Sequence, residues 1–536
     1  MARGAQPLSG AALPAPDAPL RPAVALAGWA ALALIAAFSL GAAALVAAAA
    51  DRAGALSAAD WRAARFTVTQ AALSAALSVA FALPVARALS RRRFPGRAAM
   101  VGLMGAPFLL PVVVAILGVT AVWGRAGWVS DGLAALGLPR LDIYGMPGVL
   151  LAHVFFNLPL AARLLLQAYA EIPAERWRAA AQLGLEGRAL WRAVEWPALR
   201  GAAPGALAAI FAVCATSFAV ALTLGGGPRA TTLELAIYEA AAYSFDLSRA
   251  ALLALLQLAV CAGGALAALA LAGPLAAAPG LSREAVRWDG GGRGARALDA
   301  AALTLAALFL GAPLAAVALK GLAGLGAVAP ATWASIGEAA ARSLVVAVAS
   351  AAMALALALP LSAFAAALSG ARGRLAEAAG LAPLAVSPFV LGVALFVALR
   401  PIADPAALAL PLTALVNAVM AAPYAVRMLT PPLRAALADH GRLADSLGLG
   451  GRTRARALYL ARLRGPLGFS AGVAAALSAG DLGVIALFSA PEAPTLPLLM
   501  HLLATSRQLD AAAGAALLLL GLSFGLFVVF DRLGRA

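Results

Sequence analysis

The chain has 536 residues, of which 63% are hydrophobic and only 12% are charged, and its formal net charge is +16. A soluble domain usually carries about 25% charged residues, so this composition excludes an ordinary water-soluble protein and favours an integral membrane protein. The basic residues lie in short clusters between apolar runs, a pattern typical of membrane topology and not of nucleic-acid binding.

Twelve apolar runs along the chain approach or exceed the roughly 20 residues that a spanning helix needs. We expect all of them to be helices, because each unpaired backbone amide in lipid costs several kcal/mol. The first run is too long for a signal-peptide core, and we expect it to be retained. The runs are 23–50, 66–89, 98–122, 146–169, 201–224, 250–271, 299–319, 341–367, 378–399, 406–427, 467–489 and 511–530.

The distribution of arginine and lysine predicts the orientation of these runs. If the N-terminus lies in the cytoplasm, 29 of the 40 basic residues fall in cytoplasmic segments and 11 in external loops. Cytoplasmic loops are the ones that carry an excess of basic residues. We therefore expect a multi-pass protein of the bacterial inner (cytoplasmic) membrane with both termini in the cytoplasm.

An internal repeat divides the chain. A segment rich in Gly, Pro and mixed charges, 272–298, reads as a cytoplasmic linker between a six-helix lobe at 1–271 and a second six-helix lobe at 299–536. Several pairs in the same order indicate duplication of a parallel unit. At an offset of 264 residues they are Pro159 and Pro423, Arg163 and Arg427, Gly184 and Gly448, and Ser217 and Asp481; at other offsets, Pro84 and Pro360, and Pro107–Phe108 and Pro388–Phe389.

A polar stretch follows the fourth predicted helix of each lobe. The first runs from Arg178 through Ala179, Ala180 and Leu183 to Gly184, with Pro197 at its end, and the second runs from Arg442 through Ala444 to Gly448. Both resemble the EAA motif of ABC importer permeases, in which Glu-Ala-Ala is followed by three residues and a Gly, although Arg178 and Arg442 replace the Glu, Leu443 the first Ala of the second copy, and Ala461 its Pro.

Each stretch is expected to form a short helix on the cytoplasmic surface. Ala179, Ala180 and Leu183 should share one face of the first helix at helical spacing, and small residues there would let a partner approach closely. Gly184 suits a left-handed turn, and Pro197 suits the first turn of the next helix. A plain solvated amphipathic loop is the alternative.

The residues 222–257 and the Glu195-Trp196-Pro197 corner resemble the thiamine/thiamine pyrophosphate permease family, whose fused two-lobe architecture agrees with this chain. The resemblance implies an all-α membrane fold with two type I ABC importer permease lobes (MetI-like). It also implies two copies of a separate cytoplasmic ATPase subunit and a periplasmic thiamine-binding protein. Fused ferric-iron permeases share the architecture and are the closest alternative.

Polar and glycine residues within or beside the predicted helices are candidates for the substrate path or its gate. They are Asn157, Thr216, Ser217, Gly225, Gly226, Gly227 and Asp481. Asp481 should face protein or water, because an ionised Asp at the centre of a bilayer costs roughly 2.5–3.5 kcal/mol. It could be a counter-ion for a cationic thiazolium ring, but its Gly-Asp-Leu-Gly surroundings resemble an element shared with permeases for anions, which favours a structural or gating role.

Other functions are disfavoured. No phosphate loop of the Gly-x4-Gly-Lys-Ser/Thr type occurs, so we expect no ATPase activity, enzyme function or cofactor in this chain. The three histidines show no metal-ligand spacing, and Cys214 and Cys261 read as small packing residues. A secondary transporter of the major facilitator type is a further alternative, but its Gly-x3-Asp-Arg-x-Gly-Arg motif is missing after the second helix.

Overall fold

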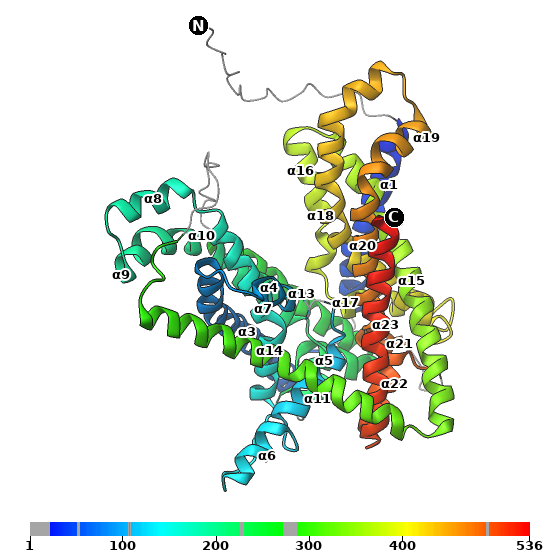
Figure 1. Ribbon diagram of the computed structural model, residues 1–536. Coiled ribbons are helices and arrows are strands. Elements are labelled where there is room, and N and C mark those ends of the chain that lie inside the picture. The colour runs from blue at the N-terminus through cyan, green and yellow to red at the C-terminus, as the bar shows by residue number, and fades with distance from the viewer. Residues whose placement is uncertain are drawn as a thin grey trace.

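The computed structural model describes residues 22–50, 54–105, 107, 109–225, 227, 230–271, 287–488 and 493–535. Within these residues every regular element is a helix, which confirms the all-α membrane fold (Figure 1). Ten helices in this part of the chain are apolar and long enough to cross a bilayer. They are Pro22–Ala50, Ala58–Arg91, Val112–Ala135, Met146–Ala170, Gly187–Ala215, Leu247–Gly264, Arg293–Ala327, Pro330–Ala367, Ala409–Ser446 and Leu509–Arg535.

Four spans that were expected to be continuous are interrupted, and these expectations were wrong. The third span of each half breaks where prolines remove backbone donors, and the fifth breaks where polar residues or Gly480 weaken the helix. The third spans are α4 (Arg97–Leu103) with α5 (Val112–Trp123), and α16 (Gly370–Ala379) with α17 (Pro388–Leu399). The fifth spans are α10 (Trp196–Ala215) with α11 (Ala219–Leu224), and α20 (Ala461–Ala479) with α21 (Gly483–Phe488).

The remaining helices complete the two halves. In the first half they are α1 (Pro22–Ala36), α2 (Ala42–Ala50), α3 (Ala58–Arg91), α6 (Trp128–Ala135), α7 (Met146–Ala170), α8 (Ala174–Gln182), α9 (Gly187–Leu190), α12 (Leu233–Tyr238) and α13 (Leu247–Leu271). In the second half they are α14 (Arg293–Ala327), α15 (Pro330–Ala367), α18 (Ala409–Ser446), α19 (Gly451–Arg454), α22 (Leu496–Thr505) and α23 (Leu509–Arg535).

Equivalent helices of the two halves have equal lengths. Helices α5 and α17 each have 12 residues and begin 276 residues apart, while α11 and α21 each have 6 residues and begin 264 residues apart. The pairing of Pro107–Phe108 with Pro388–Phe389 was therefore wrong, because Pro388 opens α17 as Val112 opens α5. Phe108 itself lies outside the described residues.

The first helix of each half packs against the other half. Helix α1 lies on α15, where the rings of Trp29 and Phe364 are 5.4 Å apart. Gly28 permits this approach, because a Cβ atom there would lie 2.3 Å from the Cβ of Phe364. Helix α14 packs against α3 and α5 of the first half as well as against α23. The halves are thus interlocked and not merely adjacent.

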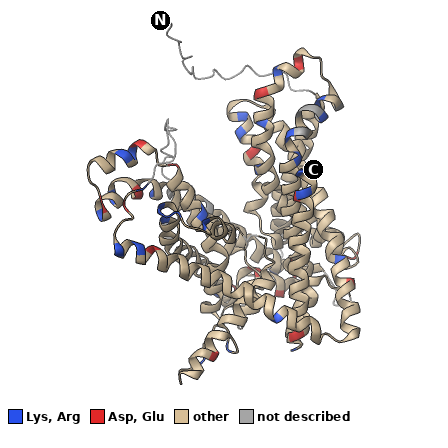
Figure 2. Cartoon of the chain, viewed as in Figure 1, with Lys and Arg blue, Asp and Glu red and all other residues tan. Residues whose placement is uncertain are grey.

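Two arms of helices separate towards one end of the molecule. One arm carries α8 and α9, and the other carries α16 and α19 (Figure 1). Many of the charged residues gather near these ends, whereas the middle of the molecule is mainly uncharged (Figure 2). The division into lobes at 1–271 and 299–536 stays a prediction, since 272–286 of the expected linker lie outside the described residues and α14 already begins at Arg293.

Candidate functional site

The first EAA-like stretch forms the short helix α8. Helix α7 ends at Ala170, and Pro173 stands directly before α8, because proline disfavours the helical conformation of the residue that precedes it. One face of α8 is buried in the first half, and Arg178 on another face is exposed. The buried residues are Ala174, Trp177 and Ala180.

The expected docking face of α8 is narrower than the sequence indicated. Ala179 is exposed and Leu183 is 73% exposed, but Ala180 is only 2% exposed and faces the first half. The expectation that Ala180 shares a face with the other two was wrong, because consecutive helical residues are about 100° apart and Trp177 and Ala180 define the buried side. The surface open to a partner therefore includes Ala179 and Leu183.

The two stretches end in the same turn. Gly184 and Gly448 adopt left-handed conformations with φ of 63° and 64°. In each turn the amide one residue past the glycine donates to a carbonyl of the last helical turn, which is the Schellman arrangement that glycine favours. The bonds are Leu185 N to Ala180 O at 2.9 Å and Leu449 N to Ala444 O at 2.9 Å.

The second stretch is not a separate helix, contrary to expectation. It is the end of α18, a single helix of 38 residues. The position of Pro173 in the first half is taken by Leu437 in the second, so nothing there stops the helix. Arg442 is exposed and Ala444 is buried like Ala180. Leu443 and Leu447 are 56% and 63% exposed, so this end of α18 also presents apolar side chains to solvent.

The chain after each turn leads back into a spanning helix. Pro197 lies in the first turn of α10, as predicted from its missing donor. In both halves a π-helical segment precedes the spanning helix, at Trp191–Glu195 and at Ala455–Leu460. Glu195, at the end of the first segment, has no exposed surface.

A charged cluster fixes the end of the linker beneath α8, and the sequence did not predict it. The guanidinium of Arg287 pairs with the carboxylates of Glu195 and Asp289, and it lies 4.3 Å from the ring centre of Trp177 on α8. Glu195 also pairs with Arg87 of α3 at 2.8 Å. Linker, α3, α8 and α10 therefore meet in one buried network.

The interruptions of the fifth spans hold three of the predicted path residues. Thr216 and Ser217 lie between α10 and α11, and the Thr216 hydroxyl donates to the carbonyl of Ala212 at 3.1 Å. Asp481 lies between α20 and α21, beside the Asn417 side chain and the backbone amides that open α21. An acidic side chain at a helix start accepts from such amides, which agrees with a structural role for Asp481.

A polar cluster lies near the interruption in each half. In the first half Ser74 Oγ and His153 Nδ1 lie 3.2 Å apart, and the Asn157 side chain donates to the His153 carbonyl and to Cys214. The positions equivalent to Ser74, His153 and Cys214 are Ser350, Asn417 and Ser478 in the second half, which are linked by hydrogen bonds of 2.8 Å and 3.1 Å. Asn157 is thus a buried structural partner in this structure, with 3% exposure.

Three aromatic rings meet between the halves next to the interruptions. Phe218 of the first half lies 4.6 Å from Phe389 of the second, measured between ring centres, and 5.1 Å from Tyr238. Tyr238 and Phe389 are 6.3 Å apart. A Cβ atom on Gly483 would lie 3.0 Å from Phe389 and 3.4 Å from Phe218. The halves are therefore closed against each other at this level.

The predicted glycine gate lies beyond α11. Gly225 is buried, and a Cβ atom there would lie 2.4 Å from the carbonyl oxygen of Ala221, so this position tolerates only glycine without a shift. Gly227 is exposed with φ of 116°. Gly226 lies outside the described residues.

Sequence reasoning missed the buried carboxylate of this region. Glu234, on α12, has 0% exposure, and neither of its carboxylate oxygens has a hydrogen-bond partner. Its signal was available, because an acidic residue between Leu233 and Leu235 stands within an otherwise apolar segment.

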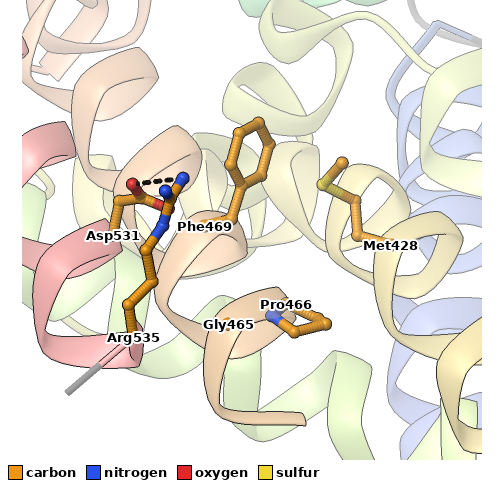
Figure 3. Close-up of a pocket in the computed structure, with 6 residues that line it drawn as sticks. All are labelled: Met428, Gly465, Pro466, Phe469, Asp531 and Arg535. Carbon is orange, nitrogen blue, oxygen red and sulfur yellow. Dashed lines mark ion pairs between the residues drawn. The ribbon is translucent and has the colours of Figure 1, made fainter. Parts of the chain in front are cut away.

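A pocket of about 260 Å³ lies within the second half, away from the three aromatic rings described above (Figure 3). All of its lining residues belong to α18, α20 and α23 of the second half, so it does not touch the surface between the halves. The lining residues are Met428, Gly465, Pro466, Phe469, Asp531 and Arg535, of which the last two form an ion pair of 2.8 Å.

Comparison with known proteins gives the family. No protein-family model matches the chain. The thiamine transport system permease protein ThiP of Brucella abortus is 40% identical over 478 residues, which cover 88% of this chain and 87% of that protein. The protein of that name from Escherichia coli is 40% identical over 478 residues, with 88% and 89% covered. A sulfate transport system permease protein, CysW of Synechocystis, is 32% identical over 138 residues, with 26% and 49% covered. The extent and identity of the first two matches show that this chain belongs to the family of thiamine transport system permeases.

Proposed function

We propose that this chain is the membrane subunit of a binding-protein-dependent ABC importer that carries thiamine or thiamine pyrophosphate into the cytoplasm. The observation that carries the proposal is the repeated turn at Gly184 and Gly448, which lies beside exposed leucines in both halves. The first turn follows α8 and the second ends α18, and these helices belong to different arms (Figure 1). Two equivalent sites suit a motor built from two equivalent subunits.

The expected partners follow from this arrangement. Two copies of a cytoplasmic ATPase would each accept one coupling element, contacting Arg178, Ala179 and Leu183 on one arm and Arg442, Leu443 and Leu447 on the other. A periplasmic thiamine-binding protein would deliver the substrate at the opposite end. The concentration of arginines near the arm ends supports a cytoplasmic location for those ends in the inner membrane (Figure 2). Both termini would then be cytoplasmic.

The proposed mechanism is alternating access between two lobes, 1–271 and 299–536. Closure of the ATPase pair on ATP would draw the arm ends together. Because the halves interlock through α1 and α14, the movement would be transmitted to the contact between Phe218 and Phe389. Separation of these two rings would then open the proposed path. ATP and the loaded binding protein would favour the outward-facing arrangement of the permease, and ATP hydrolysis would return it to the inward-facing arrangement.

The test is reconstitution of the chain in liposomes with its ATPase and binding protein. We expect ATP hydrolysis and uptake to rise when the binding protein carries thiamine or thiamine pyrophosphate, and not when ferric ion is offered. Stimulation by ferric ion alone would refute the substrate assignment, and a lack of stimulation by both would refute the importer assignment. A double variant, Leu183→Asp with Leu447→Asp, should hydrolyse no more ATP than the ATPase alone.

A further inference from the structure

Glu234 is a buried acid that the fold leaves unpaired. Its side chain is fully buried, and both carboxylate oxygens lack a hydrogen-bond partner. The Ser387 hydroxyl of the second half lies beside it. Its oxygen accepts from the amides of Phe389 and Val390 at the start of α17, so it can offer the acid a single hydroxyl proton and no positive charge. Leaving a buried carboxylate unpaired is costly, so this position calls for a function that compensates.

The surroundings of Glu234 suit a cation. Glu234 and Tyr238 are four residues apart on α12 and therefore lie on one face of it. That helix packs against α17, whose Phe389 contacts Tyr238 and Phe218 with ring centres 6.3 Å and 4.6 Å away. Aromatic faces attract cations, most strongly where water is excluded. One acidic side chain and three rings thus meet where the two halves touch.

We propose that Glu234, Phe218, Tyr238 and Phe389 form a transport site for an organic cation, with Glu234 as the counter-ion. The proposal rests on the function proposed above and specifies how the substrate is recognised: the thiazolium ring shared by thiamine and its phosphates would bind among the rings. In this structure the rings pack on one another, so the cation enters when the halves separate.

The other acids of the region fit this role less well. Asp481, the earlier candidate, lies beside Asn417 and the amides that open α21, so that only its Oδ2 atom lacks a hydrogen-bond partner, whereas both oxygens of Glu234 lack one. Glu239 directly follows Tyr238, but its side chain is exposed and not buried between the halves. The amide of Leu496 in the second half donates to the Ser343 hydroxyl, as the amide of Leu233 donates to the Thr67 hydroxyl. These two leucines are therefore equivalent, and the residue that follows is Pro497 in the second half and Glu234 in the first. The acidic side chain is a property of the first half alone.

The experiment uses the complete complex of permease and ATPase and two ligands, thiamine and a neutral thiophene analogue in which a ring carbon replaces the charged nitrogen. Binding to the complex in detergent, without binding protein, is measured beside uptake into liposomes. In Glu234→Gln we expect thiamine binding to weaken by about tenfold to a hundredfold, while the affinity for the neutral analogue stays unchanged. The matched control, Glu239→Gln, should bind thiamine as the wild type does.

The outcomes separate the site from the transport function. Equal weakening for both ligands would mean that Glu234 acts only in folding, and unchanged thiamine binding would mean that it acts elsewhere; either result overturns the site. Absence of binding of both ligands to the wild type also overturns it. Thiamine binding that depends on Glu234 without thiamine uptake would uphold the site and refute the proposed function. Thiamine uptake that is the same in Glu234→Gln as in the wild type would refute the site and uphold the proposed function.

Discussion

Removal of the Arg287 side chain should loosen α8 from its support. Arg287→Ala deletes the ion pairs with Glu195 and Asp289 and the contact with Trp177. Each charge-assisted hydrogen bond contributes about 1.5–3 kcal/mol. The two acids are not left bare, because Arg87 still pairs with Glu195 at 2.8 Å and Arg91 with Asp289 at 2.9 Å. We therefore expect a loss of about 3 kcal/mol, below the full penalty of about 3–5 kcal/mol for each broken buried pair.

The pH dependence of this loss follows from Asp289. Burial raises the pKa of Asp289, but hydrogen bonding and the charge of Arg287 outweigh it and hold that pKa below the ordinary 3.8. A lowered pKa means that the charged acid stabilises the fold above pH 3.8 and that this stabilisation disappears as the pH falls through the folded value. The difference in stability between wild type and Arg287→Ala should therefore narrow below pH 3.8.

The assay uses the two buried cysteines of the chain. Cys214 and Cys261 are inaccessible in the fold, so a thiol-reactive fluorophore reports thermal unfolding in detergent. We expect the midpoint of Arg287→Ala to fall by roughly 5 °C, and Arg287→Lys to fall less because the charge remains. Arg296→Ala, at an exposed position of α14, is the control. A midpoint for Arg287→Ala equal to that of the control would refute the reasoning.

Three further changes test other parts of the structure. Gly448→Ala should cost about 1–2 kcal/mol from its left-handed conformation alone, since a Cβ atom there meets nothing within 4 Å; a larger loss by the same thermal assay would contradict this. Thr67→Val leaves the buried Leu233 amide, 2.8 Å from the Thr67 hydroxyl, without its acceptor and should cost about 1–3 kcal/mol, and retained stability would refute it. Leu447→Asp should lower substrate-stimulated ATP hydrolysis about tenfold without changing the unfolding midpoint.

Much of the fold could be predicted because the bilayer leaves few choices. Long apolar runs must be helices, and the spacing between Gly184 and Gly448 predicted a repeat that the turns reproduce. The interruptions were harder to foresee, because a short break in the helix leaves the mean hydropathy of the apolar run almost unchanged. Only local signals marked them, namely Gly480 and the prolines before α5 and α17, and these also occur inside continuous helices such as α15, which contains Pro360.

The candidate sites were predicted unevenly for physical reasons. Glycine turns have a local sequence signature, so the turns at Gly184 and Gly448 that end the two EAA-like stretches were predicted. Burial on a short helix depends on its neighbours, so the inward orientation of Ala180 was not. The Arg287 cluster and the contact between Phe218 and Phe389 join residues that are far apart in the sequence, 92 positions in the case of Arg287 and Glu195. A single sequence carries no signal for such contacts.

The repeat also separates two kinds of function. Features kept in both halves, such as the turn glycines and the hydroxyl acceptors Thr67 and Ser343, fit the proposed pair of identical ATPase subunits. On the proposed transport path, a substrate without two-fold symmetry would be recognised by residues that differ between the halves. Glu234, whose equivalent in the second half is Pro497, is a difference of this kind. Substitutions of Glu234 should therefore change substrate selectivity, and substitutions of the turn glycines should change the coupling of ATP hydrolysis to uptake. The opposite assignment of these two effects would refute the argument.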